Sequence, residues 1–138
     1  MPKLNGVLET VLYTRDMAAA RAFFESVMGL DAHTADHRFT AYALDWNMLL
    51  LFAVGETTET VQLPDDMGTI PPHDGEGRQH VAFAIEDEAL AAWEKHLGAH
   101  DIAIEGRTRW PKGAVSLYFR DPDGHLLELV TRGIWPNY

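Results

Sequence analysis

The alternation of apolar and polar residues predicts a strand, a helix and three further strands in the first half of the chain. Residues 7–13 follow the two-residue period of a strand, and residues 17–28 carry one apolar stripe typical of an amphipathic helix. Asp16 is a suitable N-cap for this helix, and Gly29 is a typical residue at its end. We expect the following strands in the segments 31–37, 39–44 and 48–54.

The second half repeats this order of elements. Residues 80–85 predict a strand, and Asp87 is expected to cap a helix that Gly98 ends. The apolar stripe of this helix consists of Leu90, Trp93 and Leu97. Strands are then predicted at 102–104, 115–119 and 126–130.

Two connections stand out from these periodic segments. Residues 121–124 read Asp-Pro-Asp-Gly, an order typical of a type I turn between two strands. Residues 55–77 are rich in Gly, Pro, Thr and acids, lack periodicity, and indicate a linker or a loop over a cleft. We therefore expect a single domain over residues 1–138, with module 1 at about 5–54, the linker at 55–77 and module 2 at about 78–132.

Composition and charge narrow the classes of function. With 46% apolar residues among 138, the chain can bury a core, while its formal net charge of −10 opposes binding to nucleic acid or to an anionic membrane. No apolar run reaches the roughly 20 residues of a membrane span. The first residues lack the pattern of a signal peptide, so we expect a cytoplasmic location. The absence of cysteine excludes disulfides, thiolate nucleophiles and Cys-based zinc sites.

Glu9 and His80 occupy matching places in the two halves. Each lies in an alternating apolar run and is followed seven residues later by an aspartate, while Glu128 interrupts the apolar run 126–130. The period of a strand fixes which residues share a face with each of them. If the bulkier apolar face of each strand packs on a helix, the opposite faces bring Glu9, His80 and Glu128 into one cup.

A carboxylate left without a partner among apolar side chains is costly, which predicts a partner for Glu9 and Glu128. One divalent cation held by His80 and the two glutamates would provide it. This oxygen-rich set of ligands suits Zn²⁺, Ni²⁺, Mn²⁺, Fe²⁺ or Mg²⁺ and does not choose among them. In the alternative interpretations Glu9 is an exposed edge residue and His80 is an imidazole bonded to the backbone.

These residues lie in a sequence that resembles the vicinal oxygen chelate superfamily, which includes glyoxalase I, extradiol dioxygenases, fosfomycin-resistance transferases and bleomycin-binding proteins. The resemblance spans roughly residues 5–132 and rests on Glu9-x6-Asp16 leading to Ala22-Phe23-Phe24 and Gly29-Leu30, on Gln79-His80-Val81-Ala82-Phe83, and above all on residues 118–128, Tyr-Phe-Arg-Asp-Pro-Asp-Gly-His-Leu-Leu-Glu. It implies an α+β fold in which two βαβββ modules form a half-open barrel around a cup-shaped site.

The resemblance also implies roles for individual residues. The family's metal ligands fall on Glu9, His80 and Glu128. In the hypothesis of a metal-dependent enzyme, a displaced Glu9 or Glu128 is also a candidate general base for isomerisation or epimerisation. The family further implies a homodimer, in which the site can include Glu9 of the partner subunit. This sequence departs from better-known members, because many have His or Gln where Glu9 stands and glyoxalase I has an acid where Leu50 or Leu51 stands. Residues 110–114 replace the potassium-binding loop of fosfomycin transferases.

Other polar residues have weaker signals. Tyr118 is expected to face the cup with Ser116 and is a candidate catalytic donor to a substrate oxygen, with a packed tyrosine as the alternative. His73, in the loop 55–77, is a candidate proton shuttle or extra ligand, with a solvated loop residue as the alternative. His125 is expected to be structural. Arginines that could grip an anion are explained as well by surface ion pairs, namely Arg107, Arg109 and Arg120.

Three functions compete. The leading hypothesis is a divalent-metal-dependent enzyme of the glyoxalase and dioxygenase type, which acts on a small, partly hydrophobic substrate with adjacent oxygens by lyase, isomerase or dioxygenase chemistry. The alternative is a metal-free protein that binds a small molecule or drug, as bleomycin-resistance proteins do; the charge of −10 suits a cationic compound. A third possibility is a degenerate family member with a structural or regulatory role.

Overall fold

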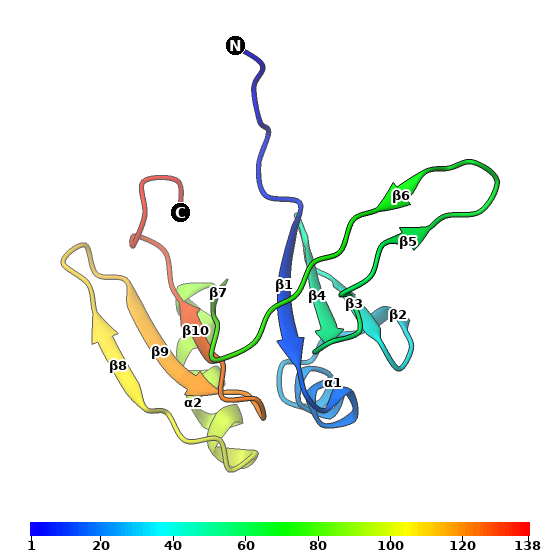
Figure 1. Cartoon of the computed structure of the whole chain (residues 1–138). Coiled ribbons are helices and arrows are strands. Elements are labelled where there is room, and N and C mark those ends of the chain that lie inside the picture. Colours follow the sequence, from blue (N-terminus) through cyan, green and yellow to red (C-terminus); the bar gives the residue numbers. More distant parts are fainter. The chain divides into compact units, whose positions relative to one another are not determined.

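The computed structural model describes residues 1–138 and divides the chain into two compact units, unit 1 (Met1–Glu76) and unit 2 (Gly77–Tyr138). Each unit has its own four-stranded mixed sheet and its own α-helix (Figure 1). Neither sheet closes on itself, because the first and last strand of each order are not paired. The predicted α+β class is confirmed. No helix has the length and apolar character needed to cross a membrane.

Unit 1 begins with one βαβββ succession. Its elements are β1 (Glu9–Thr14), α1 (Met17–Ser26), β2 (Ala32–Ala35), β3 (Phe39–Ala43) and β4 (Met48–Ala53), followed by the short strands β5 (Val61–Gln62) and β6 (Thr69–Ile70). The sheet order is β1-β4-β3-β2, with β1 parallel to β4 and the other neighbours antiparallel. The strands β1 and β2, which follow each other in the sequence, are therefore the two edges of the sheet, with β4 and β3 between them.

The two faces of this sheet are filled differently. On one face Leu12, Leu49 and Tyr42 are almost fully buried, together with Phe24 of α1. Their alternate positions place the polar Glu9 on the opposite face. Helix α1 begins as predicted, since Asp16 Oδ1 accepts the backbone N–H of Ala19 at 3.0 Å.

Unit 2 repeats the topology. Its elements are β7 (His80–Ala84), the 3₁₀ turn η1 (Asp87–Ala89), α2 (Leu90–Ala99), β8 (Gly106–Arg109), β9 (Val115–Arg120) and β10 (Leu126–Val130). The sheet order is β7-β10-β9-β8, with β7 parallel to β10, which is the order of unit 1 again. The prediction of two βαβββ modules is thus confirmed. The core residues on one face are Leu117, Phe119, Leu127 and Leu129, with Leu97 of α2.

Three details of the second half were predicted wrongly. Residues 102–104 form no strand; β8 starts at Gly106, because its pairing with β9 is set by the neighbouring strand and not by local hydrophobicity. Helix α2 continues past Gly98, and the residue with the left-handed conformation is Asp101, with φ of 57°. Asp87 opens the turn η1 before α2, and no side chain caps that turn.

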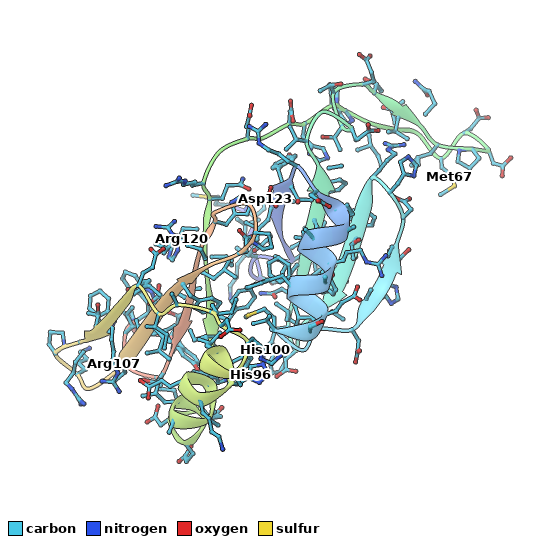
Figure 2. The ribbon with its side chains drawn as sticks, turned by 90° about the horizontal axis from the view of Figure 1, so that it is seen from below. Met67, His96, His100, Arg107, Arg120 and Asp123 are labelled. Carbon is cyan, nitrogen blue, oxygen red and sulfur yellow. The ribbon has the colours of Figure 1, made fainter.

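The segment predicted as a linker or loop carries a small hairpin. Strands β5 and β6 pair antiparallel and form an arm with Met67 near its tip (Figures 1 and 2). The base of the arm is closed by two bonds between the same residues, since the N–H of His73 donates to Thr57 O at 3.0 Å and Thr57 Oγ1 donates to His73 O. This double link holds the two ends of the arm together.

Candidate metal centre

His80 and Glu128 come together on one face of the sheet in unit 2. Strand β7 runs parallel to β10, with His80 opposite Leu126 and Ala82 opposite Glu128, so the two side chains are diagonal neighbours. His80 Nε2 lies 3.4 Å from Glu128 Oε2. The Glu128 side chain is only 6% exposed, whereas that of His80 is 49% exposed, so the pair has one buried and one open side.

A hydrogen bond to the backbone determines which ring nitrogen of His80 points its lone pair at the Glu128 carboxylate. His80 Nδ1 lies 2.9 Å from Leu126 O, and a carbonyl oxygen can only accept, so Nδ1 carries a proton. In the neutral imidazole Nε2 is then an acceptor and faces a second acceptor, Glu128 Oε2. A cation between them, either a proton or a metal ion, makes this approach favourable. A backbone carbonyl that orients an imidazole in this way is typical of histidines that bind metals.

Glu128 carries a further unmet requirement. Its Oε1 is buried and has no hydrogen-bond partner in the chain. A buried carboxylate oxygen without a donor is expensive. The donor set of one imidazole nitrogen and carboxylate oxygens therefore fits a divalent cation held at this pair.

Tyr118 lies directly opposite Glu128 across the antiparallel β9–β10 pair, so the two share a face of the sheet. Burial is the largest cause that raises the pKa of Tyr118, and the charge of Glu128 adds to it. The phenol thus keeps its proton at neutral pH. Ser116, on the same face, accepts a hydrogen bond from Trp110 Nε1 at 2.8 Å and is fully buried.

Glu9 belongs to unit 1, and its role as a third ligand stays a prediction. It is the first residue of β1, is exposed, and pairs in register with Met48. Strand β4 offers no acid, because its residues are all apolar and Leu50 and Leu51 are buried. Strand β4 therefore supplies no metal ligand, and a further ligand from the first half of the chain has to lie on another element.

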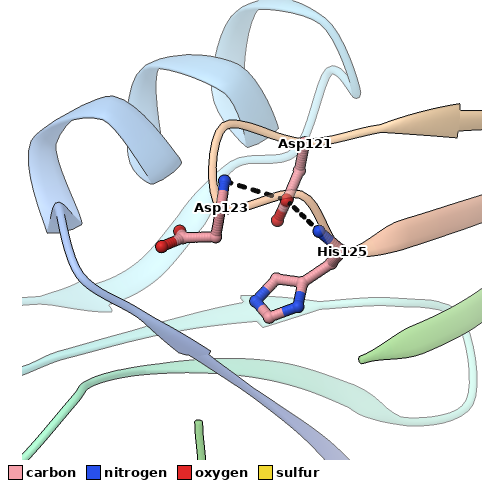
Figure 3. Close-up of side chains that lie close together, drawn as sticks. All are labelled: Asp121, Asp123 and His125. Atoms are coloured by element: carbon pink, nitrogen blue, oxygen red, sulfur yellow. Dashed lines mark hydrogen bonds between the residues drawn. The ribbon is translucent and has the colours of Figure 1, made fainter. Parts of the chain in front are cut away.

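A second group of possible ligands, not foreseen as a cluster, is formed by Asp121, Asp123 and His125 in the turn before β10 (Figure 3). One ligand atom from each lies within 4.8 Å of the others. The Asp-Pro-Asp-Gly-His sequence was the available signal. The residue types of this group suit an ion, but the hydrogen bonds of Asp121 and His125 already account for their close approach.

Asp121 and His125 are occupied by backbone amides. Asp121 Oδ1 accepts the N–H groups of Asp123 at 3.1 Å and of His125 at 2.8 Å, and His125 Nδ1 accepts the N–H of Gln79 at 2.9 Å. The turn also closes with a bond from Gly124 N–H to Asp121 O at 3.0 Å, as the sequence predicts. These bonds tie the turn to the start of β7, so the cluster holds the strand ends that carry His80 and Glu128.

Comparison with known proteins identifies the family of the chain. The sequence model of the Glyoxalase/Bleomycin resistance protein/Dioxygenase superfamily matches residues 6–129. The chain belongs to this superfamily. Its fold is also that of a lactoylglutathione lyase from Agrobacterium tumefaciens, with a TM-score of 0.85, 32% sequence identity, and coverage of 97% of this chain and 98% of that one.

Several relatives of this glyoxalase-superfamily chain are metallothiol transferases. The FosB of Shouchella clausii is 32% identical over 133 residues, which cover 93% of this chain and 81% of that protein. The FosB of Bacillus licheniformis is 44% identical over 59 residues, a stretch that spans only 37% of that relative. The fosfomycin resistance protein FosX from Mesorhizobium loti, at 17% identity and a TM-score of 0.65, shares the fold.

Two of the three arginines that could grip an anion, and His73, have structural partners. Arg107 Nε pairs with Glu94 at 2.8 Å and Arg120 Nε with Glu105 at 3.1 Å, which supports the interpretation as surface ion pairs. Both arginines are labelled in Figure 2, together with His96 and His100. His73 Nδ1 lies 2.6 Å from the Tyr13 hydroxyl, so this loop residue is fixed against β1.

Proposed function

We propose that this chain is a divalent-metal-dependent enzyme that acts on a small molecule with adjacent oxygens. His80 and Glu128 hold the cation, and Glu9 is the third ligand. The observation that carries the proposal is the buried, partnerless Oε1 of Glu128 beside an imidazole whose Nε2 is turned toward the carboxylate. Such a pair is costly by itself and becomes favourable around a cation.

The bound cation would supply Lewis acidity toward a substrate oxygen that gains negative charge. The residues of the chain supply the rest. Leu126 O holds the His80 ring through Nδ1, so the free nitrogen keeps a fixed direction. Tyr118, opposite Glu128 and protonated at neutral pH, is positioned to donate a hydrogen bond to a substrate oxygen.

For the reaction type we favour a transferase or a lyase over a dioxygenase. The two relatives that align with most of this chain at 32% identity are named metallothiol transferase and lactoylglutathione lyase. Both names refer to chemistry at a thiol compound. We therefore propose a small thiol, or a thiol adduct, as one reactant of this chain. The open, half-exposed side of His80 leaves room for such a molecule.

Metal binding is the direct test. The protein is freed of metal with a chelator, and Mn²⁺ and Zn²⁺ are titrated by calorimetry into wild type, His80→Ala and Glu128→Gln. We expect about one ion per chain, and a loss of affinity of at least tenfold in both variants. His100→Ala is the matched control, since His100 is an exposed histidine bonded to its own helix. Equal affinities in all four proteins would end the proposal.

Activity is then assayed with the metal-loaded protein. Formation or loss of lactoylglutathione tests the lyase reaction, and conjugation of a thiol to fosfomycin tests the transferase reaction. Metal-free binding of a small molecule, with no turnover in the presence of any tested cation, would instead support the alternative of a drug-binding protein.

We also propose a homodimer in which the site contains Glu9 of the partner subunit. The test mixes two inactive variants, Glu9→Gln and His80→Ala, after reversible unfolding. If each site draws residues from two chains, the mixed dimer regains one intact site and part of the activity. No regained activity, with mixed dimers shown by mass spectrometry, would assign Glu9 to the site of its own chain.

A further inference from the structure

Unit 1 contains a pocket of about 340 Å³ on the sheet face that carries Glu9. Two of the residues that line it, Phe39 and Phe52, belong to a row of rings across three neighbouring strands. Phe52 of β4 is in register with Tyr13 of β1 on one side and with Phe39 of β3 on the other. The ring centroids of Phe39 and Phe52 are 4.8 Å apart, and those of Tyr13 and Phe52 are 6.3 Å apart.

The arm over residues 55–77 makes the wall of this pocket. Thr57, Val61, Ile70 and His73 all line it. The His73 ring stands edge-on to Phe52, at 4.8 Å and 79°, while its Nδ1 bonds the Tyr13 hydroxyl. Since Thr57 and His73 are also joined through their backbones, the wall is fixed at its base. The pocket is therefore preformed and has a volume that suits a small organic molecule.

Arg38 is the cation among the lining residues, and much of its hydrogen-bonding capacity is unused. Its Nη2 donates to Glu56 O at 3.2 Å, but its Nε lies 3.8 Å from Glu56 Oε2, too far for a hydrogen bond. Nε is buried and has no acceptor in the chain, whereas the side chain as a whole is 44% exposed, so a ligand would be bound by the terminal Nη groups. A guanidinium in this state favours a carboxylate, which it can bind through two parallel bonds.

Two acids, Asp36 and Glu59, also line the pocket. Asp36 is occupied by its own turn, because its Oδ1 accepts the N–H groups of Arg38 at 2.7 Å and of Phe39 at 2.9 Å. Glu59 is exposed. Arg38 is therefore the lining residue whose charge favours an anionic ligand.

We infer that this pocket of unit 1 binds a small molecule that joins an aromatic or other flat apolar ring to a carboxylate, with the ring over Phe39 and Phe52 and the carboxylate at Arg38. This goes beyond the proposed function, because the pocket lies within unit 1 and needs no metal at His80 and Glu128. Together with the proposed function it would name the part of the substrate that unit 1 recognises.

The test uses the full chain in chelator, so that binding is measured without metal. Three probes that differ in charge are titrated by two-dimensional amide NMR: 3-phenylpropionate, the neutral 3-phenylpropanamide and the cationic 3-phenylpropylamine. We expect saturable shifts from 3-phenylpropionate at the amides of Phe39, Phe52 and His73. We expect the neutral and cationic probes to bind about tenfold more weakly or not at all.

Variants separate recognition from structure. Arg38→Gln should weaken 3-phenylpropionate binding about tenfold and leave the neutral probe unchanged. Glu56→Gln removes the ion-pair partner but keeps Arg38, so affinity should hold or rise. The matched control is Arg21→Gln, since Arg21 pairs with Glu25 on α1, at 2.9 Å, and not at the pocket. Phe52→Leu should weaken all ring-bearing probes.

Several outcomes would overturn the inference. One is the absence of saturable binding by 3-phenylpropionate, and another is tighter binding of 3-phenylpropylamine. Equal losses in Arg38→Gln and Glu56→Gln would show that the pair only holds the loop in place. Glu128→Gln must leave probe binding unchanged, which keeps a failure of this inference separate from a failure of the metal site.

Discussion

His80 Nε2 and Glu128 Oε2 face each other at 3.4 Å across two parallel strands, while His80 Nδ1 is bonded to Leu126 O. The arrangement predicts that this site stabilises the protein only when a cation is bound. Without one, a buried carboxylate oxygen has no partner and lowers the free energy of unfolding. Sites of this kind trade stability for function.

Glu128→Gln should therefore leave the metal-free protein as stable as wild type or more stable, by up to about 1 kcal/mol, because the neutral amide is cheaper to bury. The same variant should lose the rise in melting temperature that Mn²⁺ or Zn²⁺ gives to wild type. Thermal unfolding with and without metal measures both effects. Glu105→Gln is the control, since Glu105 is an exposed partner of Arg120 and should keep the metal-dependent rise.

The contribution of Asp121 to the free energy of unfolding should depend on its acceptor oxygen and not on its charge. Burial is the largest cause that raises the pKa of Asp121, while its Oδ1 accepts two amide N–H groups. Asp121→Asn keeps an oxygen for these amides and should cost little. Asp121→Ala leaves both without an acceptor and should lower the free energy of unfolding by about 1–3 kcal/mol. Urea unfolding of the two variants measures this, and equal losses would contradict it.

The sign of the pH effect at Asp121 follows from the raised pKa. The folded protein binds this proton more readily than the unfolded chain, so the charge of Asp121 reduces stability at neutral pH. As the pH falls below the folded pKa of Asp121, the carboxylate takes up a proton and this loss of stability disappears. Asp121→Asn should therefore show a steeper net loss of stability in acid than wild type, because it lacks that compensating gain.

The elements that sequence predicts well are those in which local pattern and tertiary packing agree. The capping of α1 by Asp16 and the strand around Glu128 follow from residue type and period alone. Strand β8 does not, because Gly106–Arg109 is an edge strand whose charged residues belong to the exposed rim of the sheet. The apolar segment 102–104 instead follows the end of α2, where Ile102 N–H donates to Leu97 O at 2.9 Å.

The site was predictable to the same extent. Alternation along β7 and β10 predicts that His80 and Glu128 share a face, and the structure brings them together. The hydrogen bond from His80 Nδ1 to Leu126 O could not be predicted, since it depends on strand register. The pocket at Arg38 was also missed, because its wall comes from the irregular segment 55–77, which has no periodic signal.

Gly75 should tolerate no side chain. A Cβ at this position would overlap ring atoms of Tyr13, and a packed ring on a sheet has little room to move. Gly75→Ala should lower the free energy of unfolding by about 1–3 kcal/mol and shift the NMR signals of the neighbouring His73.

The matched control is Gly98→Ala in α2, where nothing lies within 4 Å of the added Cβ. That change should stabilise the protein by about 0.5–1 kcal/mol, because alanine is the better helix former. A stable Gly75→Ala protein with unshifted His73 would contradict the contact.

Tyr42 should make the protein sensitive to alkali. Burial, together with the nearby Glu25 carboxylate, raises the pKa of Tyr42 from 10.0 to about 12. Below the unfolded pKa both states keep the proton, and stability is complete. As the pH rises from there to the folded pKa, only the unfolded chain loses the proton, so stability falls, by about 2–3 kcal/mol at most.

Tyr42→Phe removes this contribution to alkaline unfolding. At neutral pH it should cost less than about 1 kcal/mol, because the bond from the hydroxyl to Glu25 is long, at 3.4 Å. At about pH 11 the variant should be as stable as wild type or more stable. Urea unfolding of both proteins at the two pH values gives the difference, in which the other titrating groups cancel. A difference that does not change with pH would show that Tyr42 is not the residue whose ionisation opposes folding.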